Sequence, residues 1–128
     1  MSSPRPSDRK PTVLIIDDDP SHLKLYCWII ERAGWSSWAV EVRSSLVELP
    51  LGHHMDVVLM DYKYNSSLTA LDVATSVRQA FPGVPIAILS DVYSMPMDMR
   101  PFAAAFVRKG EPEELVKKLQ ELLGSRAS

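Results

Sequence analysis

The sequence predicts one α/β domain, a doubly wound parallel sheet with helices on both faces. Three short apolar runs carry this prediction, because they are rich in Val, Ile and Leu and lack polar alternation: residues 12–16, 57–60 and 85–89. Such strands are buried on both faces, as is typical of parallel sheets. Helical segments alternate with these strands, and right-handed crossovers then place helices on both faces of the sheet.

Capping residues, glycine and proline mark where the elements begin and end. After the strand 12–16, Asp19 and Pro20 are a typical N-cap and first helical residue, and Gly34 ends the helix that they begin. The remaining elements are expected as a strand at 35–40, a short helix at 43–51 interrupted near Pro50, strands at 57–60, 85–89 and 105–107, and helices at 70–81 and 111–123.

Five strands in this order suggest the flavodoxin-like arrangement 2-1-3-4-5, whose ligand crevice lies at the carboxyl ends of strands 1 and 3. The region between Ser90 and Lys109 is irregular, because it contains Pro96 and Pro101. A proline inside a helix costs roughly 3 kcal/mol. The helix expected in this region, the fourth of the fold, should therefore be short or irregular.

Composition favours a globular domain. The chain has 128 residues, of which 46% are hydrophobic, and a formal net charge of −2. This charge gives no electrostatic reason to bind nucleic acid, and no apolar run is long enough for a membrane span or a signal peptide. We expect a cytoplasmic protein with a disordered tail at 1–10, one domain at 11–124 and a C-terminal tail at 125–128.

Polar residues stand where the predicted strands end. Asp17 and Asp18 follow strand 1, Asp61 follows strand 3, Ser90 ends strand 4 and Lys109 lies just past strand 5. Parallel strands bring these residues to one crevice, where the carboxylates repel one another unless a cation lies between them. Carboxylate oxygens suit Mg²⁺, with Mn²⁺ as a second candidate, and a lysine with a hydroxyl completes a cradle for phosphate. Any one of these residues alone is more often a cap or a solvated group, but the set is hard to obtain by chance.

Four blocks of sequence resemble the signature blocks of response-regulator receiver domains, the phosphoacceptor domains of two-component signalling. The blocks are VLIIDD at 13–18, DVVLMD at 56–61, IAILS at 86–90 and FVRK at 106–109. The resemblance covers about residues 11–123 and is most specific in the acidic pair, the later strand-terminal aspartate and the lysine. It implies a single-domain regulator of the chemotaxis type.

The resemblance also implies a role for each matching residue. It makes Asp61 the phosphoacceptor. The metal ligands that it implies for Mg²⁺ are Asp18 directly, Asp17 largely through water, Asp61, and the backbone carbonyl of Lys63. The residues that it implies for phosphoryl binding and switching are Ser90, Lys109 and Phe106, the last being an aromatic whose rotamer reports activation.

The partners that the resemblance implies are a sensor histidine kinase or histidine phosphotransfer protein, and a downstream protein target. Neither direct nucleic-acid binding nor membrane binding is expected, and the chain should be a monomer or a weak homodimer. A receiver domain is not an enzyme acting on other molecules, although it catalyses its own phosphotransfer and slow dephosphorylation.

The chain departs from the family pattern at four places. Asn65 stands where proline is usual, Ala70 where glycine is usual, and Asp91 where alanine or glycine is usual. The segment from Ser90 to Lys109 is also shorter than usual. We expect Asp91 to slow phosphorylation or alter hydrolysis, because its carboxylate adds repulsion beside the phosphoryl site.

These departures leave a second hypothesis open, a pseudo-receiver that binds proteins without accepting phosphate. A flavodoxin-like cofactor binder is a third. It is disfavoured, because three acids stand after strand 1 in place of a hydroxyl- and glycine-rich phosphate loop.

The first helix carries apolar residues on its outer side. Helical periodicity points Trp28 away from the core, with Leu25 beside it, which suggests either a partner surface or an ordinary exposed apolar residue. His22, His53 and His54 do not match the spacing of a zinc site, so we expect them to be structural or solvated.

Overall fold

The computed structural model describes residues 10–44, 47–65, 67–92 and 94–127, with the side chains of 125–127 left out of the description. The predicted disordered tail, apart from Lys10, lies outside these residues. The elements are β1 (Thr12–Asp17), α1 (Pro20–Arg32), β2 (Ser36–Glu41), β3 (Val57–Asp61), α2 (Ala70–Ala80), β4 (Ile86–Ser90), the 3₁₀ turn η2 (Met97–Met99), β5 (Ala103–Arg108) and α3 (Pro112–Ala127).

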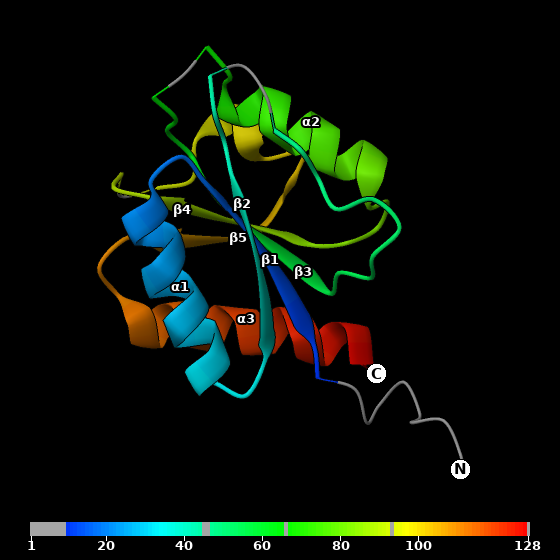
Figure 1. The fold of residues 1–128 in the computed structure, drawn as a ribbon. Helices are drawn as coiled ribbons and strands as arrows, with labels where there is room; N and C mark the ends of the chain where they lie inside the picture. The colour runs from blue at the N-terminus through cyan, green and yellow to red at the C-terminus, as the bar shows by residue number, and fades with distance from the viewer. Residues whose placement is uncertain (1–9, 45–46, 66, 93, 128) are drawn as a thin grey trace.

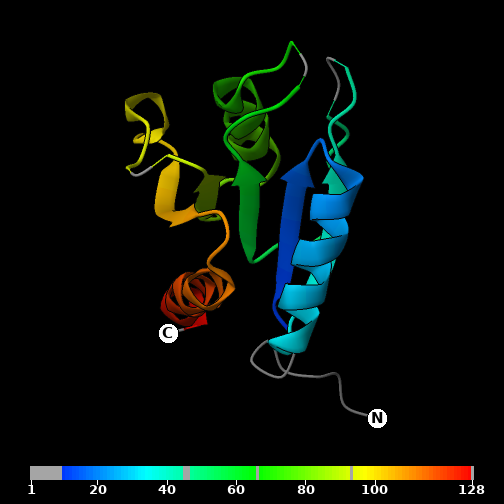
Figure 2. The same ribbon diagram turned by 90° about the vertical axis from the view of Figure 1, so that its left-hand side faces the viewer.

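The five strands form one sheet in the order β2-β1-β3-β4-β5, which confirms the predicted flavodoxin-like arrangement. Every neighbouring pair is parallel. Figure 2 shows the arrows of β1 and β3 pointing the same way. The carboxyl ends of the strands therefore share one edge of the sheet, as the sequence predicts for the polar residues that follow them.

Apolar side chains of the central strands alternate between two cores. In β1, Val13 and Ile15 pack on the face that carries α1 and α3, whereas Leu14 and Ile16 pack on the face that carries α2. Figure 1 shows these helices on opposite sides of the sheet. Because both faces are covered, β3 and β4 are buried along their whole length, which explains the absence of polar alternation in their sequences.

The first helix begins where its capping residues predict. The side chain of Asp19 accepts a hydrogen bond from the Ser21 N–H at 2.8 Å, and Pro20 is the first helical residue. Gly34 follows the helix with a φ of +93°, a conformation that favours glycine. The structure thus confirms Asp19 as a helix cap.

The predicted helix at 43–51 is wrong. The described residues of this segment form a loop, in which Ser44 has a φ of +53°. Val47 and Leu49 pack against the α2-side core. Their spacing of two residues suits extended backbone rather than a helix, and Pro50 follows them directly.

Among the described residues of the connection between β4 and β5, the single turn η2 is the only helical element, so the prediction of a short or irregular helix is confirmed. Two other elements differ from prediction by more than one residue at a boundary. β5 has six residues instead of three. The last helix does not end at Leu123 but continues through Gly124 to Ala127, into the predicted C-terminal tail. A glycine costs a helix only about 1 kcal/mol relative to alanine, so it does not by itself end one.

Candidate functional site

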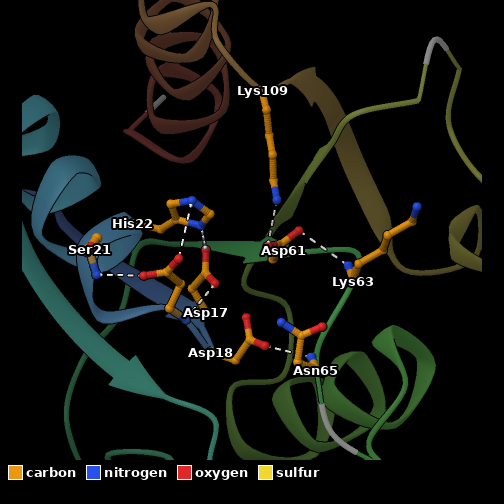
Figure 3. Close-up of polar contacts among 9 residues, drawn as sticks. Asp17, Asp18, Ser21, His22, Asp61, Lys63, Asn65 and Lys109 are labelled. Atoms are coloured by element: carbon orange, nitrogen blue, oxygen red, sulfur yellow. Dashed lines mark hydrogen bonds and ion pairs between the residues drawn. The ribbon is translucent and has the colours of Figure 1, made fainter.

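Asp61, at the end of β3, lies at the centre of a polar cluster where the strands end (Figure 3). Its side chain is almost fully buried. Lys109 reaches it from beyond β5 and places its Nζ atom 2.8 Å from Asp61 Oδ2. The other oxygen, Oδ1, accepts a hydrogen bond from the Lys63 N–H at 3.3 Å. The structure therefore brings together the predicted acceptor and the predicted lysine.

Asp17, at the end of β1, is a buried acid with an unusual pKa. Its Oδ1 atom accepts a hydrogen bond from the Asp19 N–H at 3.1 Å, and its side chain is only 1% exposed. Burial is the main cause that raises the pKa of Asp17 from 3.8 to about 6. The Asp61 and Asp18 carboxylates add to the rise, while the Asp19 amide and His22 oppose it. The site thus holds a carboxylate whose charge is poorly compensated.

Asp18 turns toward the loop between β3 and α2. Its Oδ2 atom accepts a hydrogen bond from the Asn65 N–H at 2.6 Å. Proline, the residue that the family usually has at this position, lacks an N–H and cannot make this bond. The departure at Asn65 therefore has a structural consequence, because it ties a predicted metal ligand to the loop backbone.

His22 lies at this site. From the sequence, we expected a structural or solvated residue and did not place His22 beside the acids. Its Nδ1 atom lies 3.4 Å from Asp17 Oδ2, and its Nε2 atom lies 3.6 Å from Asp19 Oδ2. One donor atom from each of His22, Asp17 and Asp61 lies within 4.8 Å of the other two. The feature of the sequence that could have placed His22 at the site is its position in the first turn of α1, directly after the acidic residues.

Lys109 is held in its charged form by the acids around it. Burial lowers the pKa of the Lys109 ammonium, but the hydrogen bond and charge of Asp61, together with the charges of Asp91 and Asp17, outweigh this and raise the pKa above 10.5. Gly110 follows with a φ of +87°, which a residue with a side chain rarely adopts. A permanent positive charge therefore lies against the candidate acceptor.

Ser90, Asp91 and Phe106 take different positions around this pair. Ser90 is buried at the end of β4, and its hydroxyl oxygen accepts a hydrogen bond from the Val92 N–H at 3.2 Å. Within the described residues, no hydrogen bond joins that hydroxyl to Asp61. Asp91 is exposed, near enough to influence Lys109. Phe106 is half-buried in β5, in register with Ile88 of β4.

Two tyrosines near the acids were not predicted from the sequence. Burial raises the pKa of Tyr64 well above 10, and the charges of Asp61, Asp17 and Asp18 add to the rise. Burial also raises the pKa of Tyr26, whose ring centroid lies 6.3 Å from that of His22. Both phenols therefore stay neutral at physiological pH. Helical periodicity can place Tyr26 on the buried side of α1, but the nearness of both tyrosines to the acids comes from the fold.

The donor atoms of the site fit a divalent cation. Asp17 and Asp61 present carboxylates, and Asp17 Oδ2 is shielded from solvent without a hydrogen bond to the described residues. Asp18, the predicted direct ligand, lies next to them but is bonded to Asn65. The backbone carbonyl of Lys63 stays a predicted ligand. In Figure 3, the Lys63 side chain points away from Asp61.

The outer side of α1 is exposed as predicted. Leu25 is 50% exposed and Trp28 is 57% exposed. Trp28 lines a groove between α1 and α3, and the guanidinium of Arg32 lies 4.9 Å from the centre of its ring. A partner role for Leu25 and Trp28 stays a prediction. None of the helices in the described part of the chain is both long and apolar enough to span a bilayer.

Comparisons with known proteins agree with this fold. No family model matches the chain. A probable transcriptional regulatory protein, TcrX of Mycobacterium tuberculosis, is 29% identical over 87 residues, which cover 67% of this chain and 37% of that protein. The chain thus aligns with little more than a third of this curated relative.

Solved structures match over nearly the whole chain. A response-regulator receiver domain protein of Clostridium thermocellum superposes with a TM-score of 0.76 at 21% identity, covering 91% of this chain and 97% of that one. The Vibrio cholerae chemotaxis protein CheY4 gives a TM-score of 0.72 at 21% identity, with 90% and 100% coverage. A CheY-like receiver domain protein of Methanospirillum hungatei gives 0.73 at 17% identity, with 93% and 98% coverage. The chain therefore has the fold of response-regulator receiver domains.

Proposed function

We propose that this protein is a phosphorylation-dependent signalling switch, in which Asp61 accepts a phosphoryl group from a histidine kinase or a histidine phosphotransfer protein. The observation that carries the proposal is the pair of Asp61 and Lys109, whose atoms lie 2.8 Å apart at the carboxyl edge of the sheet. A buried carboxylate beside a fixed ammonium suits a nucleophile that receives a charged group.

The chemistry follows from the residues around Asp61. A carboxylate oxygen attacks phosphorus, and the bond to the donor's imidazole or acyl oxygen breaks. Lys109 then offsets part of the charge of about −1.5 to −2 that the phosphoryl group carries. The Ser90 hydroxyl, which accepts a hydrogen bond from Val92, would rotate to donate to a phosphoryl oxygen. Such a rotation couples the site to Asp91, at the start of the β4–β5 connection, and to Phe106 in β5.

We propose Mg²⁺ as the cation, with Mn²⁺ as a second candidate. Asp17, Asp18 and Asp61 would hold it together with the Lys63 carbonyl, and Asp18 would exchange its bond to Asn65 for this role. When bound, the cation supplies positive charge that offsets repulsion between the carboxylates and the incoming phosphate. The shielded Asp17 Oδ2 atom supports this proposal.

The proposed phosphoacceptor role also leads us to propose the protein's activity, partners, location and oligomeric state. The protein would transfer phosphate only to itself and release it slowly, so it would not be an enzyme acting on a separate substrate. Its partners would be the phosphodonor and a downstream protein, without direct contact to nucleic acid. We place it in the cytoplasm as a monomer or weak homodimer.

A pseudo-receiver is the second candidate, favoured by the short β4–β5 connection and by Asp91 near Lys109. Intact-mass measurement after incubation with acetyl phosphate and Mg²⁺ separates the two. The switch predicts a phosphoryl adduct in the wild type and none in Asp61→Asn. An unmodified wild type at saturating acetyl phosphate would favour the pseudo-receiver.

A further inference from the structure

His22 has no part in the function proposed above, yet it faces the two buried carboxylates. Its Nδ1 atom and Asp17 Oδ2 are 3.4 Å apart. Both atoms are shielded from solvent, and neither makes a hydrogen bond within the described residues. Leaving a buried polar atom unsatisfied costs roughly 1–3 kcal/mol, unless a ligand completes its contacts. The pair therefore points to a ligand that both atoms share.

One of the carboxylates that an all-oxygen metal site would use is already hydrogen-bonded. Asp18 Oδ2 is bonded to the Asn65 N–H at 2.6 Å. The donor atoms that do lie close together, within 4.8 Å, belong to His22, Asp17 and Asp61. Figure 3 shows the His22 ring above Asp17, while Asp18 lies on the other side with Asn65. The closest set of donors is thus one nitrogen and two oxygens.

We propose that His22 is a metal ligand, and that His22, Asp17 and Asp61 bind a first-row divalent transition ion such as Co²⁺ or Zn²⁺ more tightly than Mg²⁺. Imidazole nitrogen suits these ions, whereas Mg²⁺ takes oxygen ligands. Ligands about 2.0–2.2 Å from a tetrahedral zinc ion lie roughly 3.4 Å from one another, which is the separation of His22 Nδ1 and Asp17 Oδ2.

This inference deepens the proposed function, on which it rests, because the ion would share Asp61 with the phosphoryl group. A transition ion held by His22 would be in place before phosphorylation. Asp18 and Asp19 add negative charge beside the donor set, and Lys109 compensates only one carboxylate. The balance of charge therefore favours a divalent cation.

Calorimetric titration of the full chain with Co²⁺ and, separately, with Mg²⁺ tests the inference. In His22→Gln, we expect Co²⁺ to bind about tenfold more weakly or worse, with Mg²⁺ affinity changed by less than about twofold. The matched control is His54→Gln, because His54 lies on the surface with its Nε2 atom 2.9 Å from Asp56 Oδ1. It should leave both affinities unchanged.

A measurement on the wild type makes the test independent of any variant's folding. In the Co²⁺-loaded protein, the exchangeable ring proton of His22 should appear as a strongly shifted signal in the proton NMR spectrum. Equal Co²⁺ affinity in wild type and His22→Gln, or a loss confined to His54→Gln, overturns the inference. If Mg²⁺ binds normally in those cases, only the role of His22 fails. If neither cation binds, the metal dependence of the proposed function fails as well.

Discussion

The carboxyl ends of β1 and β3 and the start of the connection from β4 to β5 lie at the same edge of the sheet, but different interactions hold these two regions. At the ends of β1 and β3, Asp17, Asp18 and Asp61 each accept a hydrogen bond from a backbone N–H. In the connection, Met99 of η2 is the one buried side chain among the described residues of 91–102.

This difference suggests separate roles for the two regions: the acids carry out the chemistry, and the connection changes in response to it. Backbone hydrogen bonds hold the acids in place, so the acid site is pre-formed. The connection has few buried contacts, and segments of this kind open at the lowest free energy in a fold. We expect phosphorylation at Asp61 to act on this weaker region.

The largest expected effect concerns Met99, the buried side chain that anchors the connection to the core. Met99→Ala should lower the free energy of unfolding by about 2–5 kcal/mol, because it removes a fully buried side chain from the α2-side core. Met97→Ala, two residues away and 78% exposed, should change it by less than about 0.5 kcal/mol. Urea denaturation measures both. Similar small effects for the two variants would show that η2 is not anchored by Met99.

The next effect concerns the acid site and has a defined pH dependence. The folded pKa of Asp17 is raised to about 6 from 3.8, so between these values the folded protein binds more protons than the unfolded chain. Stability should therefore fall as pH rises from about 4 to 6, and the loss is complete above pH 6.

Replacing Asp17 with Asn removes this loss. In the absence of divalent cations, Asp17→Asn should raise the free energy of unfolding at pH 7.5 by up to about 3 kcal/mol and should have little effect at pH 3.5. Urea denaturation at the two pH values checks the prediction. A variant that is less stable than the wild type at pH 7.5 would contradict the view that Asp17 is poorly compensated.

A smaller effect lies where the two regions meet. Asp91→Asn should speed phosphorylation by acetyl phosphate about threefold, because an exposed charge near Lys109 repels an anionic donor by less than about 1 kcal/mol. Quench-and-mass kinetics at low and high salt give the rates. The gain should shrink as the salt concentration rises. If the variant and the wild type react at the same rate at low salt, Asp91 does not slow phosphorylation.

The smallest effect tests the surface of the connection. The Tyr62 hydroxyl donates a hydrogen bond to Asp98 Oδ1 at 3.1 Å, in an exposed position. Tyr62→Phe should cost at most about 0.5 kcal/mol, since such a bond is exchanged for one with water. Thermal unfolding measures the change. A cost as large as that of Met99→Ala would mean that a polar contact, not the apolar anchor, holds the connection.

Features that depend on local sequence were predictable. The buried runs before Asp17 and Asp61 predicted the central strands, and Asp19 with Pro20 predicted the start of α1. Proline content was enough to predict a short element between β4 and β5. Each of these follows from a short stretch of sequence, so no knowledge of distant contacts was needed.

Features that depend on tertiary contacts were not predictable. The described residues of the segment 43–51 form no helix, and Val47 and Leu49 instead pack against the α2-side core from a loop. The departure from proline at Asn65 could be seen in the sequence, but the hydrogen bond from its N–H to Asp18 could not. His22 was set aside because zinc motifs are recognised by spacing within the chain, while its neighbours Asp17 and Asp61 meet it through the fold.

The central claim is that Asp61, and no other acid of the cluster, receives the phosphoryl group. Borohydride reduces an acyl phosphate to an alcohol, so it converts a phosphorylated aspartate to homoserine and marks the acceptor permanently. After treatment with acetyl phosphate and Mg²⁺, followed by borohydride, peptide sequencing by mass spectrometry should find homoserine at position 61. Homoserine at position 17 or 18 in place of 61, or at none of the three, would contradict the account.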